Sequence, residues 1–218
     1  MRVVIAGGHG KIATLLKREL AGRGDTAVGL IRNPEHAAAL RAAGAEPVVC
    51  DLEHTDVDTL AAHLTGADAV VFAAGAGPGS GAARKDTVDR GAAVLLADAA
   101  VRAGVRRYLL VSSMGVDNPP APDTDDVWAA YLRAKKAAED DVTGRDLDVT
   151  VLRPGRLTDD EPAGRITLAR PVTPGAISRA DVARVVLALL DAPGAAGHTV
   201  ELVAGDTPIA DAVAALAR

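Results

Sequence analysis

Short runs of apolar residues alternate along this chain with longer stretches in which apolar positions recur every three or four residues. The short runs are typical of buried strands, and the longer stretches are typical of amphipathic helices. Strands are predicted at residues 2–6, 26–31, 46–50, 69–74, 107–112, 148–153 and 199–204, and the clearest helices at 10–21, 83–103, 127–142 and 178–191. This alternation predicts an α/β fold with a doubly wound parallel sheet of about seven strands and helices on both faces.

Three irregular segments interrupt the alternation, at residues 73–83, 116–126 and 155–177. Each follows the carboxyl end of a predicted strand, where ligands bind in open parallel sheets; the alternative is that they are surface linkers. A length of 218 residues suits one domain with a substantial core. We expect a single domain, residues 1–218, whose substrate is covered by the loops around 75–84, 115–126 and 155–177. Ser178 and Asp181 have the spacing of a capping box at the start of the last helix.

The segment VVIAGGHGKIA at the start of the chain joins a predicted strand to a predicted helix through three glycines. Gly7 permits a tight turn, Gly10 allows a pyrophosphate to approach the backbone at the helix N-terminus, and Ala13 allows close packing of helix on strand. In this context the pattern predicts a Rossmann-type dinucleotide site. The alternative is an ordinary tight turn. The residues expected to contact the cofactor here are Gly7, Gly8, His9, Gly10, Lys11 and Ile12.

The end of the second predicted strand indicates which dinucleotide is bound. An acidic residue there is typical of NAD sites, but this chain has Arg32, whose guanidinium can pair with the 2′-phosphate of NADP. NADP is therefore predicted in preference to NAD; the alternative is that Arg32 is only solvated. Asp51 either accepts a hydrogen bond from adenine or caps the next turn. The expected cofactor-binding set is completed by residues at the ends of later strands, Leu52, Ala73, Ala74, Gly75, Ser112 and Pro154, and by Lys135 on a predicted helix.

A tyrosine and a lysine four residues apart, Tyr131 and Lys135, lie on one face of a predicted helix. An ammonium group near a phenol stabilises the phenolate and lowers the pKa of the phenol, which would make the pair a proton relay. Ser113, or as second choice Ser112, ends the preceding strand and can hold a substrate oxygen. Taken alone, such a pair is an ordinary helix-surface feature.

These segments together resemble the atypical short-chain dehydrogenases/reductases. The resemblance is closest to the NAD(P)-binding NAD-dependent epimerase/dehydratase group, related to NmrA-like proteins and flavin reductases. It extends from VVIAGGHGKIA through DAVVFAAGAG, GVRRYLLVSSMG and YLRAKKAAE to VLRPGRLT and ISRADVARVVLALLD. It implies catalytic roles for Ser113, Tyr131 and Lys135. Asp89 stands where most relatives outside this group carry asparagine, and an ionised carboxylate cannot donate as an amide does.

Composition and charge exclude several other classes. The formal net charge of −5 leaves no basic footprint for nucleic acid, and no apolar run approaches the ~20 residues of a membrane-spanning helix. The single cysteine, Cys50, excludes an intramolecular disulfide and suits a reducing cytoplasm. The five histidines lack metal-ligand spacing, so no metal site is expected. The nucleophile-elbow and Walker patterns are absent.

The function predicted from the sequence is hydride transfer between NADPH and a small carbonyl or alcohol. A nucleotide-sugar epimerase or dehydratase is an alternative, disfavoured because few residues remain for a substrate domain. A non-catalytic NADPH sensor like the NmrA-like proteins is another, disfavoured by the Ser, Tyr and Lys set. The substrate is an unidentified small molecule, and an aromatic content of 2% argues against a pocket that stacks on rings. The alanine-rich face of residues 91–103 packs either on its own sheet or on a second subunit of a homodimer.

Overall fold

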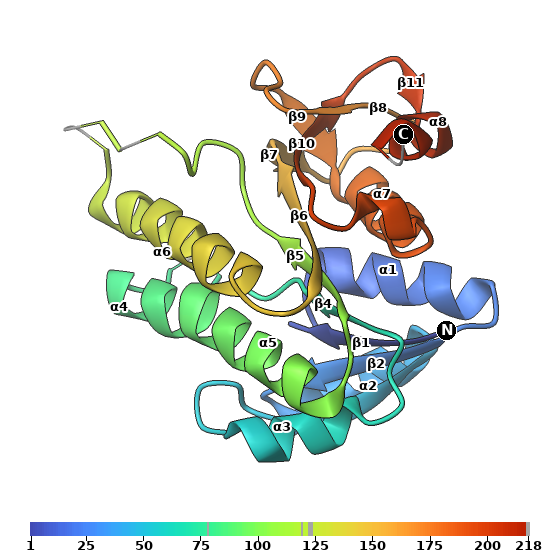
Figure 1. Cartoon of the computed structure of the whole chain (residues 1–218), viewed down its shortest axis with the longest axis vertical. Helices are drawn as coiled ribbons and strands as arrows, with labels where there is room; N and C mark the ends of the chain where they lie inside the picture. Colours follow the sequence, from blue (N-terminus) through green and yellow to red (C-terminus); the bar gives the residue numbers. More distant parts are fainter. Residues whose placement is uncertain (78, 119, 122–123, 217–218) are drawn as a thin grey trace.

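The computed structural model describes residues 1–77, 79–118, 120–121 and 124–216. Within them, a nine-stranded sheet has the order β11-β8-β10-β6-β5-β4-β1-β2-β3, and β7 pairs separately with β9 (Figure 1). The strands are β1 (Arg2–Ala6), β2 (Thr26–Ile31), β3 (Ala45–Val49), β4 (Ala69–Phe72), β5 (Arg107–Val111), β6 (Asp148–Pro154), β7 (Arg156–Thr158), β8 (Arg165–Ala169), β9 (Ala176–Ser178), β10 (Thr199–Ala204) and β11 (Thr207–Pro208). The helices are α1 (Lys11–Gly22), η1 (Pro34–His36), α2 (Ala37–Ala42), α3 (Val57–Leu64), α4 (Ala82–Arg84), η2 (Lys85–Gly91), α5 (Ala92–Ala103), α6 (Asp126–Thr143), α7 (Arg179–Leu190), η3 (Pro193–Ala195) and α8 (Ile209–Leu216).

The sheet is parallel from β3 through β10, and only β8 runs in the opposite direction, antiparallel to both of its neighbours, β10 and β11. The chain moves outward from β1 to β3 and then returns to the other side of β1 as β4. Ligands bind at such a switch point, outside the carboxyl ends of the strands. The predicted α/β class and doubly wound parallel sheet are therefore confirmed, and the candidate site is expected where β1 and β4 end.

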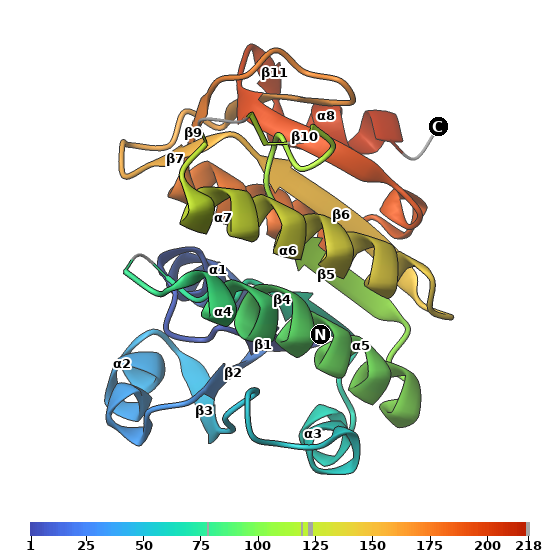
Figure 2. The ribbon, with the colours of Figure 1, turned by 90° about the vertical axis from the view of Figure 1, so that its left-hand side faces the viewer.

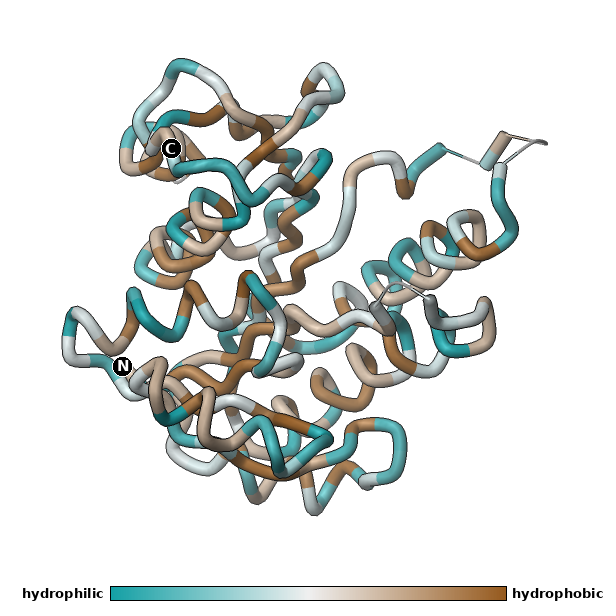
Figure 3. Tube along the Cα trace, turned by 180° about the vertical axis from the view of Figure 1, so that it is seen from behind, coloured by the Kyte–Doolittle hydropathy of each residue, from teal (hydrophilic) through white to brown (hydrophobic). Residues whose placement is uncertain are grey.

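Strand β1 shows why both faces of the sheet need helices. Successive side chains of a strand point to opposite faces. Val3 and Ile5 pack in the core on the side of α1 and α7, whereas Val4 and Ala6 pack on the side of α3, α5 and α6. Figure 2 shows α5 and α6 in front of the sheet with α1 and α7 behind it, and Figure 3 shows hydrophobic colour concentrated along the central strands. No helix of the described residues is long and apolar enough to cross a membrane.

The predicted strands and helices agree with the structure to within two residues at each end, but two expectations were wrong. The sheet has nine strands rather than about seven. The segment 155–177, expected to be irregular, contains β7, β8 and β9. Its prolines Pro162, Pro171 and Pro174 lie between these strands, where they interrupt no ladder of hydrogen bonds.

Two smaller features complete the comparison with the sequence. The Ser178 hydroxyl caps α7 by accepting the N–H of Asp181 at 3.0 Å, as predicted. The Asp181 carboxylate accepts the Ser178 hydroxyl at 3.1 Å rather than the Ser178 N–H of a full capping box. It also accepts the N–H groups of Ala163 and Gly164, each at 2.9 Å, and so fixes the loop before β8. The alanine-rich face of α5 is buried within the chain itself, through Ala92, Ala93, Ala97, Ala99 and Ala100.

Candidate active site

The glycine turn after β1 lies tightly against the ends of β2 and β4. Gly7 has a φ of +79°, and a Cβ on it would lie 2.6 Å from the Cα of Ala74. A Cβ on Gly8 would lie 2.8 Å from the Cα of Gly29 in β2. Gly10 precedes α1, and no side chain caps the helix. The N–H groups in the first helical turn of α1 are therefore free to bind a ligand at the glycine turn. This cradle fits a diphosphate, because a helix N-terminus favours negative charge.

We expect Gly7→Ala to weaken both the fold and the cofactor site. The positive φ costs an alanine about 1–3 kcal/mol, and the methyl group must displace the backbone of Ala74. Chemical denaturation should show a loss of unfolding free energy of about that size, and titration should show weaker NADPH binding. Gly81→Ala is the matched control, since Gly81 has a φ of −67° and no atom within 4 Å of a built Cβ. Equal behaviour of the two variants would contradict the role given to the turn.

A cavity of about 400 Å³ opens beside this turn at the carboxyl ends of β1 to β4. Most of the residues predicted to bind the cofactor line it: Gly7, Gly8, His9, Gly10, Arg32, Asp51, Leu52, Ala73, Ala74 and Gly75. Several other lining residues are not predicted by the sequence motifs, among them Asn33, His36, Glu53 and Arg84. Asn33 and Glu53 directly follow the predicted site residues Arg32 and Leu52, and His36 lies four residues after Arg32; this proximity in sequence is a usable signal. Arg84 follows an irregular loop, and no sequence pattern points to it.

Two arginines of the cavity lining, Arg32 and Arg84, both contact the carboxylate of Glu53. Its carboxylate accepts from Arg84 at 2.5 Å, from the Thr87 hydroxyl at 2.8 Å and from Arg32 at 3.2 Å. The guanidinium of Arg84, more than any other neighbour, lowers the pKa of Glu53. Arg32 is 58% exposed and Glu53 only 17%. Arg32 is therefore free to turn one edge of its guanidinium toward a phosphate while Glu53 keeps Arg84 as its partner.

His9 of the glycine turn stacks on His36, with ring centroids 3.6 Å apart and ring planes 8° from parallel. Burial, then the charges of His36 and Lys17, lower the pKa of His9. Lys17 is fully buried beneath the turn, and its ammonium donates to the carbonyl oxygen of Gly8. Burial lowers the pKa of Lys17 to about 8. Lys17 thus holds the glycine turn on its buried side, and the two imidazoles border the turn on the side of the cavity.

Three predicted cofactor contacts point elsewhere in the structure. The Lys11 ammonium lies 2.5 Å from Asp159 at the surface and does not line the cavity. The Ile12 side chain packs against the hydrophobic core, so both residues offer the site only their backbone N–H groups. Asp51 lines the cavity, but its carboxylate accepts from the Glu53 N–H at 3.1 Å. Asp51 thus caps the turn, and its contact with adenine stays a prediction.

Tyr131 and Lys135 lie on α6 at the same edge of the sheet. The Lys135 side chain is buried, and its Nζ donates to Val111 O at 3.1 Å and to Ala74 O at 3.4 Å. It also lies 3.5 Å from the Asp89 carboxylate and 6.0 Å from the centroid of the Tyr131 ring. Ala74 belongs to the cavity lining as well. The Tyr-Lys pair and the cofactor cavity are therefore adjoining parts of one site.

Asp89 occupies the position where most relatives outside the group carry asparagine. It is fully buried in η2, a π-helix, and one of its oxygens accepts the N–H of Ala76 at 3.1 Å. Its other oxygen faces Lys135, and its charge opposes the fall in the pKa of Lys135 that burial causes. Asp89 thus holds the loop after β4 and serves as the counter-ion of the lysine. Single turns of π-helix occur frequently at functional sites.

The expected fall in the pKa of Tyr131 is not what the structure shows. Burial raises the pKa of Tyr131 to about 12, contact with the Ser113 hydroxyl opposes the rise, and the charge of Asp89 adds to it. Burial outweighs any stabilisation of the phenolate by Lys135, whose Nζ also contacts Asp89 and two carbonyl oxygens. The phenol is consequently protonated at neutral pH and suited to act as a proton donor.

The two serines that end β5 have different surroundings. Ser113 is partly exposed beside Tyr131, and its hydroxyl donates to Met114 O at 3.2 Å. Ser112 is buried, and within the described residues its Oγ has no hydrogen-bond partner. The carbonyl of Pro154 at the end of β6 accepts the Met114 N–H at 3.0 Å and so fixes the turn that carries Ser113. This placement favours Ser113 over Ser112 as the group that contacts substrate.

A buried ionic network behind the Tyr-Lys pair was not predicted. The Arg153 side chain is 2% exposed and donates to both oxygens of Glu139, at 3.0 and 2.5 Å. It also donates to both oxygens of Asp117, at 2.5 and 3.0 Å, and Arg170 contacts Asp117 at 2.7 Å. Glu139 lies one helical turn beyond Lys135, and its charge, like that of Asp89, opposes the fall in the pKa of Lys135 that burial causes. The network ties the loop after β5 to β6 and α6.

Comparison with known proteins agrees with this site. A sequence profile described as NAD(P)H-binding matches residues 7–193. A Bacillus subtilis (strain 168) protein named "Uncharacterized sugar epimerase YhfK" is 33% identical over 214 residues, which cover 98% of this chain and 99% of that protein. Among solved structures, a Bacillus halodurans protein named as a candidate NAD-dependent epimerase/dehydratase has 36% identity and a TM-score of 0.90 over 99% of each chain. The oxidoreductase YlbE from Lactococcus lactis has 26% identity and a TM-score of 0.85, covering 99% of this chain and 96% of that one.

The fold and site define an NAD(P)-binding protein of the oxidoreductase and epimerase-like class. The chain belongs to the NAD(P)H-binding family that the profile describes, and it is similar to the NAD-dependent epimerase/dehydratase group. The resemblance inferred from the sequence motifs is confirmed.

Proposed function

We propose that this protein is an NADPH-dependent oxidoreductase that reduces a carbonyl compound to an alcohol, with Tyr131 as proton donor. The observation that carries the proposal is the position of Ala74, which lines the cofactor cavity and accepts a hydrogen bond from Lys135 at 3.4 Å. One residue thus joins the two halves of the site. Incubation with NADPH and a panel of carbonyl compounds should show oxidation of NADPH. Binding of NADPH without turnover of any carbonyl, quinone or flavin acceptor would favour a sensor instead.

The residues of the cavity fit the two ends of the cofactor differently. The uncapped N-terminus of α1 and the glycine turn would hold the pyrophosphate, and Arg32 with Arg84 would hold the 2′-phosphate. Lys135, which already reaches the loop after β4, would hold the nicotinamide ribose. When bound, the reduced nicotinamide supplies a hydride to the carbonyl carbon of the substrate.

The protein's own groups would then act on the carbonyl oxygen. Ser113 orients the oxygen through a hydrogen bond, and Tyr131 donates its phenolic proton as negative charge develops there. Lys135, 6.0 Å from the Tyr131 ring centroid, stabilises the phenolate that remains. Asp89 opposes the fall in the pKa of Lys135 that burial causes and so favours its charged form. Hydride and proton together complete the alcohol, and the phenol regains its proton from solvent.

We expect Arg32→Ala to weaken the binding of NADPH by about 10- to 100-fold, because a hydrogen bond between charged groups contributes about 1.5–3 kcal/mol. Binding of NADH, which lacks the 2′-phosphate, should change little. Calorimetric titration of both coenzymes measures the difference. Arg102→Ala is the matched control, since Arg102 is 67% exposed and pairs with Asp58. An equal loss of affinity for NADPH and NADH would show that Arg32 does not read the 2′-phosphate.

A second candidate is an epimerase that uses the cofactor without consuming it. The names of the Bacillus relatives favour it. Such an enzyme oxidises and then reduces the same substrate, so it must retain its cofactor between the two steps. The purified protein would then carry tightly bound nicotinamide nucleotide, visible in its absorbance, and would isomerise a sugar nucleotide with no net change in NADPH.

A further inference from the structure

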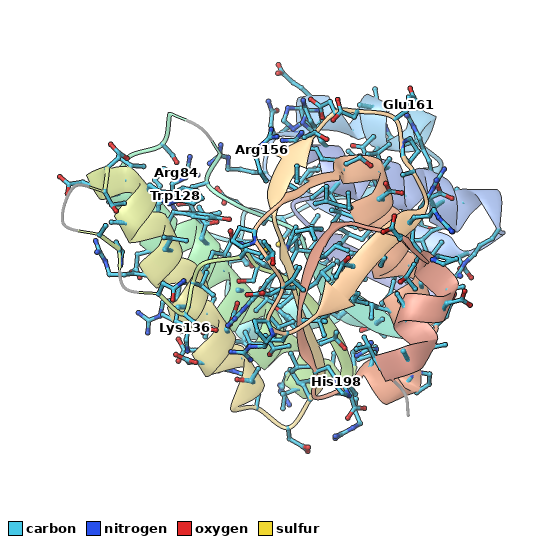
Figure 4. The ribbon with its side chains drawn as sticks, turned by 90° about the horizontal axis from the view of Figure 1, so that it is seen from above. Arg84, Trp128, Lys136, Arg156, Glu161 and His198 are labelled. Atoms are coloured by element: carbon cyan, nitrogen blue, oxygen red, sulfur yellow. The ribbon has the colours of Figure 1, made fainter. Side chains whose placement is uncertain are left out.

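The exposed aromatic surface of this chain is concentrated beside the proton donor. The chain has only four aromatic residues of the Phe, Trp and Tyr types. Phe72 and Tyr108 are fully buried in the core. Trp128, by contrast, is 50% exposed, and its ring stacks on that of Tyr131 with centroids 4.9 Å apart. Figure 4 shows Trp128 near the N-terminal end of α6, with Lys136 farther along the helix. The low aromatic content argues against a pocket that stacks on rings, but Trp128 leaves one exposed aromatic side chain beside Tyr131 on which a ligand can stack.

A buried cation, Lys85, lies near the same Tyr131 ring, and we call Trp128, Tyr131 and Lys85 together the aromatic subsite. Lys85 is 8% exposed, and its Nζ lies 5.6 Å from the centroid of the Tyr131 ring. Its hydrogen bond is to Gly77 O at 3.0 Å. The carboxylates nearest to it in sequence are engaged elsewhere, since Asp86 pairs with Arg90 at 3.6 Å and Asp89 with Lys135 at 3.5 Å.

An ammonium group has three N–H donors, and buried charges are normally paired with an opposite charge. Within the described residues Lys85 has one carbonyl oxygen and one aromatic face as partners, and it has no carboxylate. A ligand with an anionic group would supply the missing counter-charge. An extended aromatic face at Trp128 would at the same time favour a ligand with a flat conjugated ring system.

We propose that the substrate is a planar conjugated carbonyl compound with an anionic group, stacked on Trp128 and bound through its anion by Lys85. This inference rests on the proposed function for the chemistry, because Tyr131 donates the proton to the carbonyl oxygen and NADPH supplies the hydride. No further reactant is required. The subsite itself is a matter of binding and is testable without turnover.

Trp128 is the only tryptophan in the chain, so its fluorescence reports directly on this subsite. The probes are an anthraquinone carboxylate, the neutral anthraquinone carboxamide of the same shape, and the non-planar oxocyclohexane carboxylate, each added to the protein saturated with NADP⁺. Fluorescence lifetime separates quenching by contact from absorption by the probe. We expect the carboxylate to quench Trp128 and to bind about 10- to 100-fold more tightly than the carboxamide. The non-planar acid should neither quench nor compete.

Two variants test the assignments separately. Lys85→Gln should reduce the ratio of affinities for carboxylate and carboxamide to near one. Trp128→Leu, followed by calorimetry, should weaken both flat probes alike. Arg102→Gln, a charge change at the surface outside the site, should alter neither. Equal affinity of the two anthraquinones for the parent protein, or an unchanged ratio in Lys85→Gln, would overturn the proposal. Fluorescence that responds to protein concentration and not to the probes would assign Trp128 to an interface between subunits and would also overturn it.

These outcomes are distinguishable from failure of the proposed function. If NADPH binds and small neutral carbonyls are reduced while the anthraquinone carboxylate leaves Trp128 unquenched, only the substrate assignment fails. If NADPH does not bind, the proposed function fails whatever the probes do.

Discussion

Tyr131→Phe is expected to abolish reduction of the carbonyl substrate while leaving NADPH bound. The substitution removes one oxygen atom, the one that carries the donated proton, and keeps the ring stacked on Trp128. Loss of a positioned general acid typically lowers the rate by about 10²–10⁴-fold. Single-turnover measurement of NADPH oxidation gives the rate, and titration of the same sample gives the affinity for the cofactor.

The chain supplies a matched control in its other tyrosine. Tyr108 is fully buried in β5, and its hydroxyl donates to Ala93 O at 2.9 Å, away from the site. Tyr108→Phe removes the same atom and should cost about 1 kcal/mol of stability without slowing turnover. A Tyr131→Phe variant as fast as the parent would remove Tyr131 from the mechanism.

The raised pKa of Tyr131 also predicts how the two directions of the reaction depend on pH. Reduction needs the protonated phenol, and with the pKa near 12 this form persists through neutral and mildly alkaline pH. Oxidation of the alcohol needs the phenolate, whose population grows with pH. Rate profiles should therefore be flat for reduction near neutrality and rising for oxidation. If the reduction rate of the parent protein fell as pH rose from 6 to 7, the proton donor would be a group other than Tyr131.

Arg153→Met should be among the most destabilising single substitutions in the protein. It removes a guanidinium that binds two carboxylates and leaves Glu139, whose side chain is 5% exposed, as a buried charge without its partner. Breaking a buried ion pair from one side costs about 3–5 kcal/mol. This is a large part of the ~5–15 kcal/mol by which domains are stable. Chemical denaturation of variant and parent measures the loss directly.

Two comparisons separate this effect from a simple loss of packing. Arg170→Gln removes an Asp117 partner that is 46% exposed and should cost about 0–1 kcal/mol. The double variant Arg153→Met with Glu139→Leu removes both buried charges and should recover much of the loss. If Arg153→Met alone proved no worse than Arg170→Gln, the network would not hold the loop after β5.

The network has a pH signature as well. Arg153, with Arg170, lowers the pKa of Asp117 from 3.8 to about 2. Because the folded-state pKa is the lower one, the stabilising contribution is complete above pH 4 and is lost as pH falls toward 2. Parent protein should therefore lose stability across this acidic window, and Arg153→Met should lose less.

Much of the fold and part of the site are readable from the sequence. Parallel strands are buried on both faces, so β1, β2 and β5 appear as unbroken apolar runs, and Gly7 and Arg32 follow such runs directly. The strands within 155–177 escaped prediction because each is short and its pairing with β10 or with another short strand depends on segments distant in sequence.

The chemical properties of the site residues were harder to predict from the sequence than the strands, because they depend on tertiary contacts. The spacing of Tyr131 and Lys135 showed that they share a helix face, but not that burial would outweigh the lysine and raise the pKa of the phenol. In the same way, nothing in the local sequence reveals that Lys85 is buried with no carboxylate partner among the described residues, or that Arg84 meets Glu53 across the cavity. Such effects are sums over residues that only the folded chain brings together.

The central claim is that a phosphorylated nicotinamide dinucleotide binds on the glycine turn between β1 and α1, and calorimetric titration with NADPH and NADH tests it most directly. The account predicts saturable binding of one molecule of NADPH per chain, more tightly than NADH, with the affinity reduced in Gly7→Ala. Absence of binding by both coenzymes, with the protein shown to be folded, would contradict it.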